Sequence, residues 1–155
     1  MKMTGDLHFL VKQPADPPSQ MLSIYLNVEP SPVGRLNRNY DGELLRRLQS
    51  IQEQLSDEAE RRNFRASAGR VKHFLAAHKP TGLGLILFCN DRDRLFWWRD
   101  IKVPVPSDVR WNTGPHLRPL LELGDEFERY GIILTDREEA HLFTVFMGEI
   151  EQHLE

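Results

Sequence analysis

The apolar run Leu83–Cys89 constrains the fold more than any other stretch of the sequence. Gly82 precedes it and the polar segment Asn90–Asp93 follows it. The run is too short to cross a membrane, but it has the length and composition of a strand that is buried on both faces. Alternating apolar side chains over Leu95–Val103 predict a returning strand after a tight turn. We therefore expect Gly82–Val103 to form the central hairpin of a sheet, and it carries no catalytic motif of its own.

Other segments show equally regular patterns. Alternation over Met21–Val28 predicts a strand, which Pro30 and Pro32 end. Two helices are expected next, with Asp41 and Ser56 as their N-caps. Their apolar residues recur at helical spacing: Leu44, Leu45, Leu48, Ile51 and Leu55 in the first, and Phe64, Ala68, Val71 and Leu75 in the second, which runs toward His78. After the central hairpin, the pattern predicts a third helix over Leu117–Phe127 and a second hairpin over Gly131–Met147.

These elements predict an α/β fold of the α+β type. A mixed, mostly antiparallel sheet would carry packed helices, in the order strand, helix, helix, hairpin, helix, hairpin. The prolines between residues 14 and 18 predict that residues 1–20 form a tail and linker. We expect one domain over residues 21–129 and the first hairpin of a truncated second domain over residues 130–155.

The composition is that of an ordinary globular protein, with 40% hydrophobic and 28% charged residues among 155. Cys89 is the single cysteine and lies in the apolar run, so we expect a core thiol. Neither a membrane-spanning segment nor a signal peptide is visible, which makes the cytoplasm the expected location. Charge is uneven: residues 30–80 hold ten Lys/Arg against six Asp/Glu, a net of +4, whereas residues 120–155 hold two against ten, a net of −8.

The basic part contains two groups of candidate RNA-binding residues. Arg35 and Arg38 lie in a polar loop that also contains a tyrosine and asparagines, a combination that suits phosphate and base contacts. Arg61, Arg62 and Arg65 follow one another at the start of the second predicted helix. Both groups have plainer interpretations, a solvated loop for the first and i,i+4 partners of nearby carboxylates for the second.

We find no catalytic constellation in the sequence. Gly82-Leu83-Gly84 lacks the third glycine and the helix of a dinucleotide fingerprint, and there is no P-loop or nucleophile elbow. His73 and His78 are five residues apart, which is off the i,i+4 spacing that would face one metal ion. We therefore predict no enzymatic activity, no metal site and no cofactor for this chain.

The order of the elements resembles the amino-terminal domain of the archaeal and eukaryotic class-1 peptide-chain release factors, and the bacterial release-factor-like relatives most of all. Three stretches carry the likeness: Met21–Pro30 (MLSIYLNVEP), Gly82–Asn90 (GLGLILFCN) and Gly114–Ile150, which includes PHLRPLL and YGIILTD. The resemblance covers nearly the whole chain from Met21 on, and it implies that the hairpin Gly131–Ile150 begins the second domain of that family.

Two features of the family are not matched. Its first domain decodes stop codons with an Asn-Ile-Lys-Ser loop, and nothing in Glu43–His78 matches that loop. Its second domain promotes peptidyl-tRNA hydrolysis with a Gly-Gly-Gln loop, which this sequence does not contain.

The resemblance implies a ribosome- or RNA-binding module that acts in termination, rescue or dormancy. Its expected partners are the ribosome, rRNA or tRNA, and downstream domains of its own chain. The alternative is a protein-interaction or homodimerisation domain without a nucleic-acid role, in which the strand Ala140–Met147 pairs edge to edge.

Overall fold

The structure, a computed structural model, describes residues 19–30 and 39–154. The chain divides between His116 and Leu117 into two compact units, and each is described by itself. The first unit holds a four-stranded sheet and two helices, and the second holds one helix and a three-stranded sheet. All described strand pairs are antiparallel, so the predicted α+β class with a mostly antiparallel sheet is confirmed.

The first unit is organised around β1 (Gln20–Asn27) and β2 (Gly84–Asn90), the inner strands of the sheet. The strand order is β3-β2-β1-β4, with β3 (Leu95–Ile101) and β4 (Asp108–Thr113) at the edges. Every residue of β2 is buried, as the apolar run predicts. The predicted central hairpin therefore has one inner strand and one edge strand.

The strand β4 is absent from the predicted order of elements, which passed from the hairpin directly to a helix. Its sequence, DVRWNT, is short and polar and follows Pro104 and Pro106. No local periodicity in this segment predicts a strand. Pairing with β1 creates it, because Ile24 lies opposite Val109 and Leu22 opposite Trp111 in the ladder.

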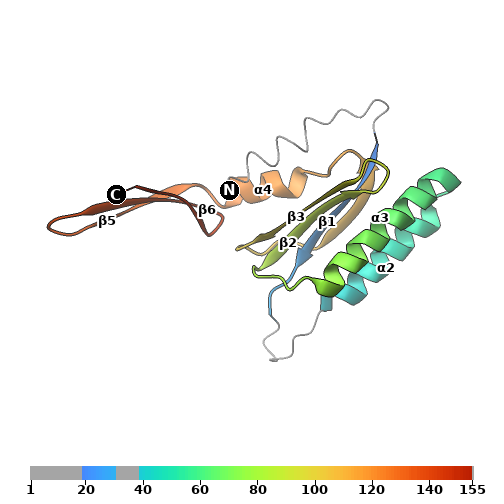
Figure 1. The fold of residues 1–155 in the computed structure, drawn as a ribbon, viewed down its shortest axis with the longest axis horizontal. Coiled ribbons are helices and arrows are strands. Elements are labelled where there is room, and N and C mark those ends of the chain that lie inside the picture. The colour runs from blue at the N-terminus through green and yellow to red at the C-terminus, as the bar shows by residue number, and fades with distance from the viewer. Residues whose placement is uncertain (1–18, 31–38, 155) are drawn as a thin grey trace. The chain divides into compact units, whose positions relative to one another are not determined.

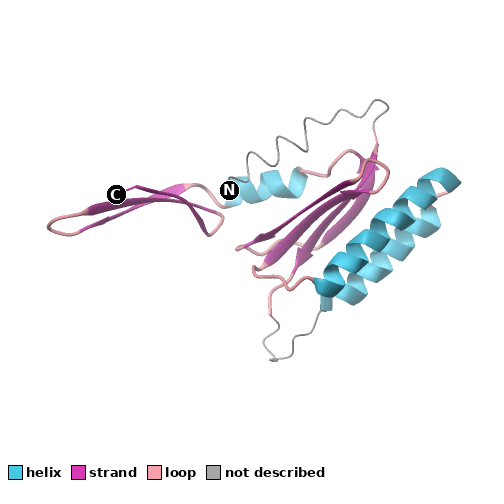
Figure 2. Cartoon of the chain, viewed as in Figure 1, coloured by secondary structure: helices cyan, strands magenta, loops and turns pink. Residues whose placement is uncertain are grey.

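Helices α2 (Asn39–Gln54) and α3 (Glu58–Ala77) lie side by side along one face of this sheet (Figures 1 and 2). The main core lies between them and the sheet. It consists of alternate strand residues and the inward faces of the helices: Leu22, Ile24, Leu26, Leu44, Leu48, Phe64, Ala68, Val71, Leu75, Leu85, Leu87, Cys89 and Val109. Burial of each of the larger side chains contributes about 1.5–3 kcal/mol of hydrophobic free energy. Together these contributions hold the helices on the sheet.

The helix starts differ slightly from the prediction. Asp57 caps α3, since its carboxylate accepts a 2.7 Å hydrogen bond from the Glu60 N–H, and Ser56 lies one residue before the cap. Asp41 lies inside the first turn of α2, which begins at Asn39. A carboxylate favours a helix N-terminus through the helix dipole whether it is the N-cap residue or lies in the first turn. The local sequence therefore does not decide which residue is the cap.

Two glycines allow the close approach of other segments to β2. A Cβ on Gly82 would lie 2.0 Å from the carbonyl oxygen of Ile101, and a Cβ on Gly84 would lie 2.9 Å from the side chain of Val105. Any side chain at these positions would collide with the end of β3 or with the segment that follows it. The Gly-Leu-Gly sequence thus serves packing.

The second unit contains α4 (Arg118–Glu126) and the sheet β5-β6-β7, formed by Tyr130–Thr135, Ala140–Phe146 and Glu149–Leu154. The hairpin of β5 and β6 agrees with the predicted one. The third strand, β7, was not predicted. It pairs with the other edge of β6, so the expected edge-to-edge pairing of the strand Ala140–Met147 is wrong. The turn before β7 places Met147 and Gly148 at positive φ. All six residues of β5 are exposed. The predicted division into residues 21–129 and 130–155 stays a prediction.

Candidate nucleic-acid interface

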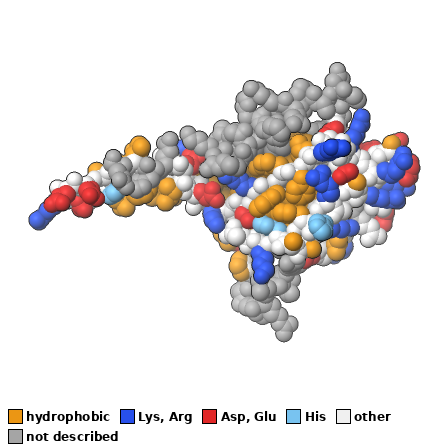
Figure 3. Space-filling model, viewed as in Figure 1, with side chains coloured by type: hydrophobic (Ala, Val, Ile, Leu, Met, Phe, Trp, Pro, Cys, Tyr) orange, Lys and Arg blue, Asp and Glu red, His pale blue; other side chains and the backbone are white. Residues whose placement is uncertain are grey.

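Helix α3 carries five of the seven Lys and Arg residues of the two helices. Its inward side is fixed by the buried residues Phe64, Ser67, Ala68, Val71 and Leu75. Helical geometry then turns Arg62, Arg65 and Lys72 away from the core, and all three are exposed. Figure 3 shows Lys and Arg side chains gathered, with carboxylates among them, over the part of the surface where α3 begins.

The structure separates the three predicted arginines of α3. Arg61 points toward the joint between the helices, where its guanidinium donates to the carbonyl oxygen of Leu55 and lies 3.9 Å from Glu58. Its Nε is buried, and no hydrogen-bond partner for it occurs among the described residues. Arg62 and Arg65, by contrast, make no ion pair within the described part of the chain and are available to a partner.

The two loop arginines, Arg35 and Arg38, lie outside the described residues, so they stay a prediction from the sequence. On α2, Arg47 is engaged by Glu43 at 2.7 Å and by Asp108 at 3.5 Å.

The turn between β2 and β3 adds cations that the sequence reasoning missed. The Asp91 N–H donates to Ser67 Oγ at 2.9 Å, and the Arg92 N–H donates to Asn63 Oδ1 at 3.1 Å. Arg70 of α3 lies 3.6 Å from the Asp91 carboxylate. These contacts dock the turn on α3 and place the exposed Arg92 beside its N-terminal half. In the sequence, Asp91–Arg94 shows only the pattern of a turn.

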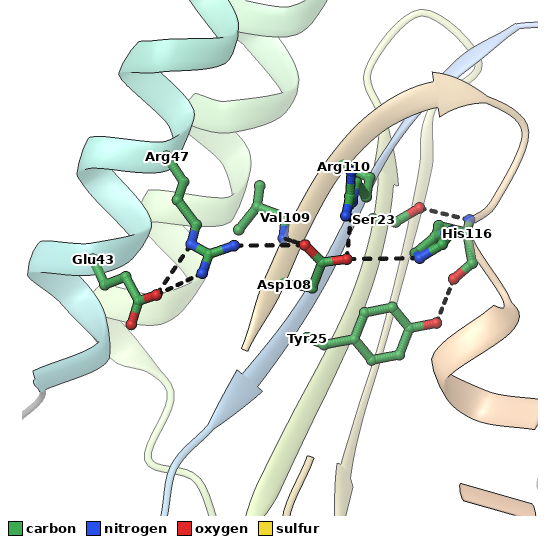
Figure 4. Close-up of polar contacts among 8 residues, drawn as sticks. All are labelled: Ser23, Tyr25, Glu43, Arg47, Asp108, Val109, Arg110 and His116. Carbon is green, nitrogen blue, oxygen red and sulfur yellow. Dashed lines mark hydrogen bonds and ion pairs between the residues drawn. The ribbon is translucent and has the colours of Figure 1, made fainter. Parts of the chain in front are cut away.

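A second polar cluster centres on Asp108, at the start of β4 (Figure 4). Its carboxylate lies 2.9 Å from Arg110 Nε, 3.5 Å from Arg47 Nη1 and 3.6 Å from His116 Nε2. One carboxylate thus lies between two guanidinium groups and an imidazole. The contact with Arg47 joins α2 to the edge strand β4.

Tyr25 completes this cluster from the neighbouring strand β1. Its hydroxyl donates to the carbonyl oxygen of His116, and the His116 N–H donates to Ser23 Oγ at 2.9 Å (Figure 4). Burial, followed by the field of Asp108, raises the pKa of the Tyr25 phenol far above its ordinary value. Tyr25 and Ser23 are almost fully buried, so neither offers a nucleophile to a substrate. These hydrogen bonds hold the segment after β4 against β1.

Cys89 lies in the core, as predicted, with its Sγ 3.7 Å from the carbonyl oxygen of Ser67. Burial raises the pKa of this thiol to about 11, so it stays protonated and unreactive at neutral pH. Among the described residues, no three His, Cys, Asp or Glu side chains come together as metal ligands. None of the described helices has the length and apolar character needed to cross a membrane.

Comparison with known proteins agrees with the resemblance seen in the sequence. Residues 115–155 match the family model of the bacterial archaeo-eukaryotic release factor family 10. Residues 115–155 are therefore release-factor-like. The predicted resemblance is thereby confirmed, and the matched residues are those of α4 and the β5–β7 sheet, with the segment that leads into them.

Two solved structures are similar to the chain, and the first of them shares its fold. One, described as an archaeal protein, is 21% identical with a TM-score of 0.58, over 98% of this chain and 44% of the other. Another, the crystal structure of the archaeal translation termination factor aRF1, is 20% identical with a TM-score of 0.47, over 87% of this chain and 38% of the other. The release-factor-like chain thus spans less than half the length of these two proteins. No curated protein sequence matches it.

Proposed function

We propose that the release-factor-like chain binds ribosomes or RNA through the solvent-facing side of α3, as a module of a protein that acts in translation termination, rescue or dormancy. The observation that carries the proposal is the exposed row Arg62, Arg65 and Lys72 in a fold of this type. Guanidinium and ammonium groups that are not engaged by carboxylates are the groups that bind phosphates. Such a module would work in the cytoplasm, where ribosomes translate.

The proposal includes no stop-codon decoding and no catalysis by the described residues. The Asn-Ile-Lys-Ser and Gly-Gly-Gln loops are both absent from the sequence. Hydrolysis of peptidyl-tRNA by the parent protein would require a Gly-Gly-Gln loop elsewhere. The role proposed for this chain is therefore docking.

The salt dependence of binding gives a quantitative test. Three phosphate contacts from α3 predict that log K falls with log salt at a slope of about −2 for single-stranded RNA, which is about 15–20-fold between about 50 and 200 mM. Anisotropy of a labelled single-stranded oligoribonucleotide and co-sedimentation with purified ribosomes measure this directly. Affinity that does not change with salt would contradict the proposal.

Charge reversal identifies the surface. The double variant Arg62→Glu/Arg65→Glu should weaken binding more than tenfold at low salt and reduce the slope by about 1.4, since two of three contacts are lost. The matched control is Lys79→Glu/Lys102→Glu, which makes the same change in net charge at exposed positions past the C-terminal end of α3. Equal losses in the two double variants would show a general charge effect and overturn the assignment of the surface.

One observation favours the alternative of a protein-interaction or dimerisation surface. The β5–β7 sheet exposes large apolar side chains, with Ile133 at 68%, Ile150 at 64% and Leu134 at 56% of their full accessibility. Exposed apolar side chains gathered on one sheet mark a surface that packs against another protein part. Light scattering across concentration distinguishes the two functions, because a tight dimer without RNA affinity would support the alternative alone.

A further inference from the structure

An open pocket of about 650 Å³ lies between α3 and the edge strand β3. Its volume is in the range of small-molecule sites, about 300–1,000 Å³. It belongs to the flank of α3 that faces away from α2 and β4. Arg61, Arg62 and Arg65, the predicted arginines that lie among the described residues, do not line it. The lining residues are Gly69, Arg70, His73, Phe74, Ala77, His78 and Phe96.

Aromatic rings form the wall of this pocket. The Phe74 ring is stacked on His78 at 4.7 Å, and its centroid lies 5.3 Å from Phe96 and 5.0 Å from Trp98. Phe74 and Phe96 are 22 positions apart in the sequence, so only the packing of α3 on β3 brings them together. Both rings are half-buried, and both line the pocket.

Two polar contacts hold the wall in place. His78 Nε2 lies 3.1 Å from Asp100 Oδ2, which also accepts a hydrogen bond from Thr81 Oγ1 at 3.2 Å. The His78 and Asp100 side chains are only 13% and 12% exposed. The imidazole is thereby fixed in orientation, and its stack on Phe74 is preorganised before any ligand arrives.

One cation, Arg70, lines the pocket. The Arg70 guanidinium lies 5.2 Å from the Phe96 ring centroid, in cation–π geometry, with its charge shared with Asp91. His73 is exposed at the mouth. None of the lining residues is acidic. The outer side of the same helix carries Arg62, Arg65 and Lys72, so aromatic faces and phosphate-binding groups occur on one element.

We propose that this pocket takes one unstacked nucleobase of a single-stranded RNA segment whose phosphates contact α3. A base stacked on the Phe74 and Phe96 wall would meet the edge of Arg70, and the neighbouring phosphates would meet His73 and the exposed cations. Stacking on an aromatic side chain beside a basic surface is how single strands are bound without sequence preference. This inference rests on the proposed RNA binding and adds to it a preference for single strands over duplexes.

The test compares Phe74→Leu with Trp97→Leu in anisotropy measurements. Leucine at position 74 keeps an apolar side chain of similar reach but removes the ring. Trp97 is the matched control, because it lies on the same strand as Phe96 but on the opposite face of the sheet, against Phe88. The probes are a labelled single-stranded oligoribonucleotide and a blunt RNA duplex of the same length.

Wild-type protein should bind the single strand more tightly than the duplex. Phe74→Leu should weaken binding to the single strand about 5- to 100-fold, the range for loss of one base stack, and leave duplex binding unchanged. Trp97→Leu should change neither. Urea unfolding of each variant verifies that it is folded, and Phe96→Leu supplies a second ring deletion if Phe74→Leu fails that control.

Three other outcomes would contradict the nucleobase pocket. If Arg62→Glu/Arg65→Glu weakens binding and neither ring deletion does, the pocket assignment is overturned while the proposed function stands. If wild-type protein binds no RNA at any salt, the proposed function fails and the pocket falls with it. If the ring deletions change self-association and leave RNA binding intact, the pocket is a protein-binding groove, and the nucleobase assignment is wrong.

Discussion

Two glycine-to-alanine substitutions should change stability in opposite directions. At Gly82 the new Cβ would lie 2.0 Å from the carbonyl oxygen of Ile101 and 2.8 Å from its carbonyl carbon. That oxygen accepts a 2.9 Å hydrogen bond from the Leu83 N–H, so the collision must move the backbone and weaken the bond. At Gly69, in the interior of α3, an added Cβ meets nothing within 4 Å. The added methyl group therefore collides with the backbone at position 82 and has free space at position 69.

The magnitudes follow from these contacts. For Gly82→Ala, overpacking costs about 1–3 kcal/mol and the weakened hydrogen bond about 0.5–1.5, offset by about 0.4–1 from lower entropy of the unfolded chain. The expected net loss is about 0.5–4 kcal/mol. Gly69→Ala should gain about 0.5–1 kcal/mol, since glycine is a poor helix former.

Urea unfolding followed by tryptophan fluorescence measures both changes. The three tryptophans, at positions 97, 98 and 111, all lie in the unit that contains Gly69 and Gly82, so the signal reports that unit. With m-values of about 1–3 kcal/mol/M, the two midpoints should move apart by about 0.3 M or more at unchanged m. Equal midpoints, or a higher midpoint for Gly82→Ala than for wild type, would refute the packing account of this glycine.

Three further predictions follow from buried polar groups. Because the pKa of Tyr25 is raised in the folded state, stability should be constant below the ordinary value of 10.0 and fall as the pH rises above it. Tyr25→Phe should remove that fall in alkaline urea titrations and cost about 1–2 kcal/mol at neutral pH, since the His116 carbonyl loses its donor. Cys89 should react with a thiol reagent at neutral pH only at the rate of unfolding, and rapid modification of native protein would disprove its burial. Trp111→Phe should cost about 1 kcal/mol by thermal unfolding, because the 2.9 Å hydrogen bond from its Nε1 to Glu60 is lost; no change in Tm would show that water replaces it.

Much of the candidate interface was predictable because helical periodicity decides which residues face solvent. The spacing of Phe64, Ala68 and Val71 fixes the inward side of α3, and with it the outward position of Arg62 and Arg65. The same periodicity does not show that Arg61 turns to the carbonyl of Leu55, because that carbonyl belongs to the end of another helix. A cation that the helical pattern places at the surface can therefore be engaged by a tertiary contact, as Arg61 is.

The sequence by itself determined the elements with strong local patterns. The alternation in β1, the unbroken apolar run of β2 and the apolar spacing in α2 and α3 each report burial of their own side chains, and burial imposes a period on the chain. These patterns were enough for the α+β class and for the resemblance to release factors.

Only the tertiary structure decided which elements are neighbours. Pairing with β1 makes β4 a strand, and β3 lies at the edge of the sheet. Tertiary packing also brings Phe74 into contact with Phe96, and Asp108 into contact with His116. Such contacts link residues that are far apart in the chain, and no local period encodes them. The pocket beside β3 is the clearest case, because its wall exists only where a helix and an edge strand meet.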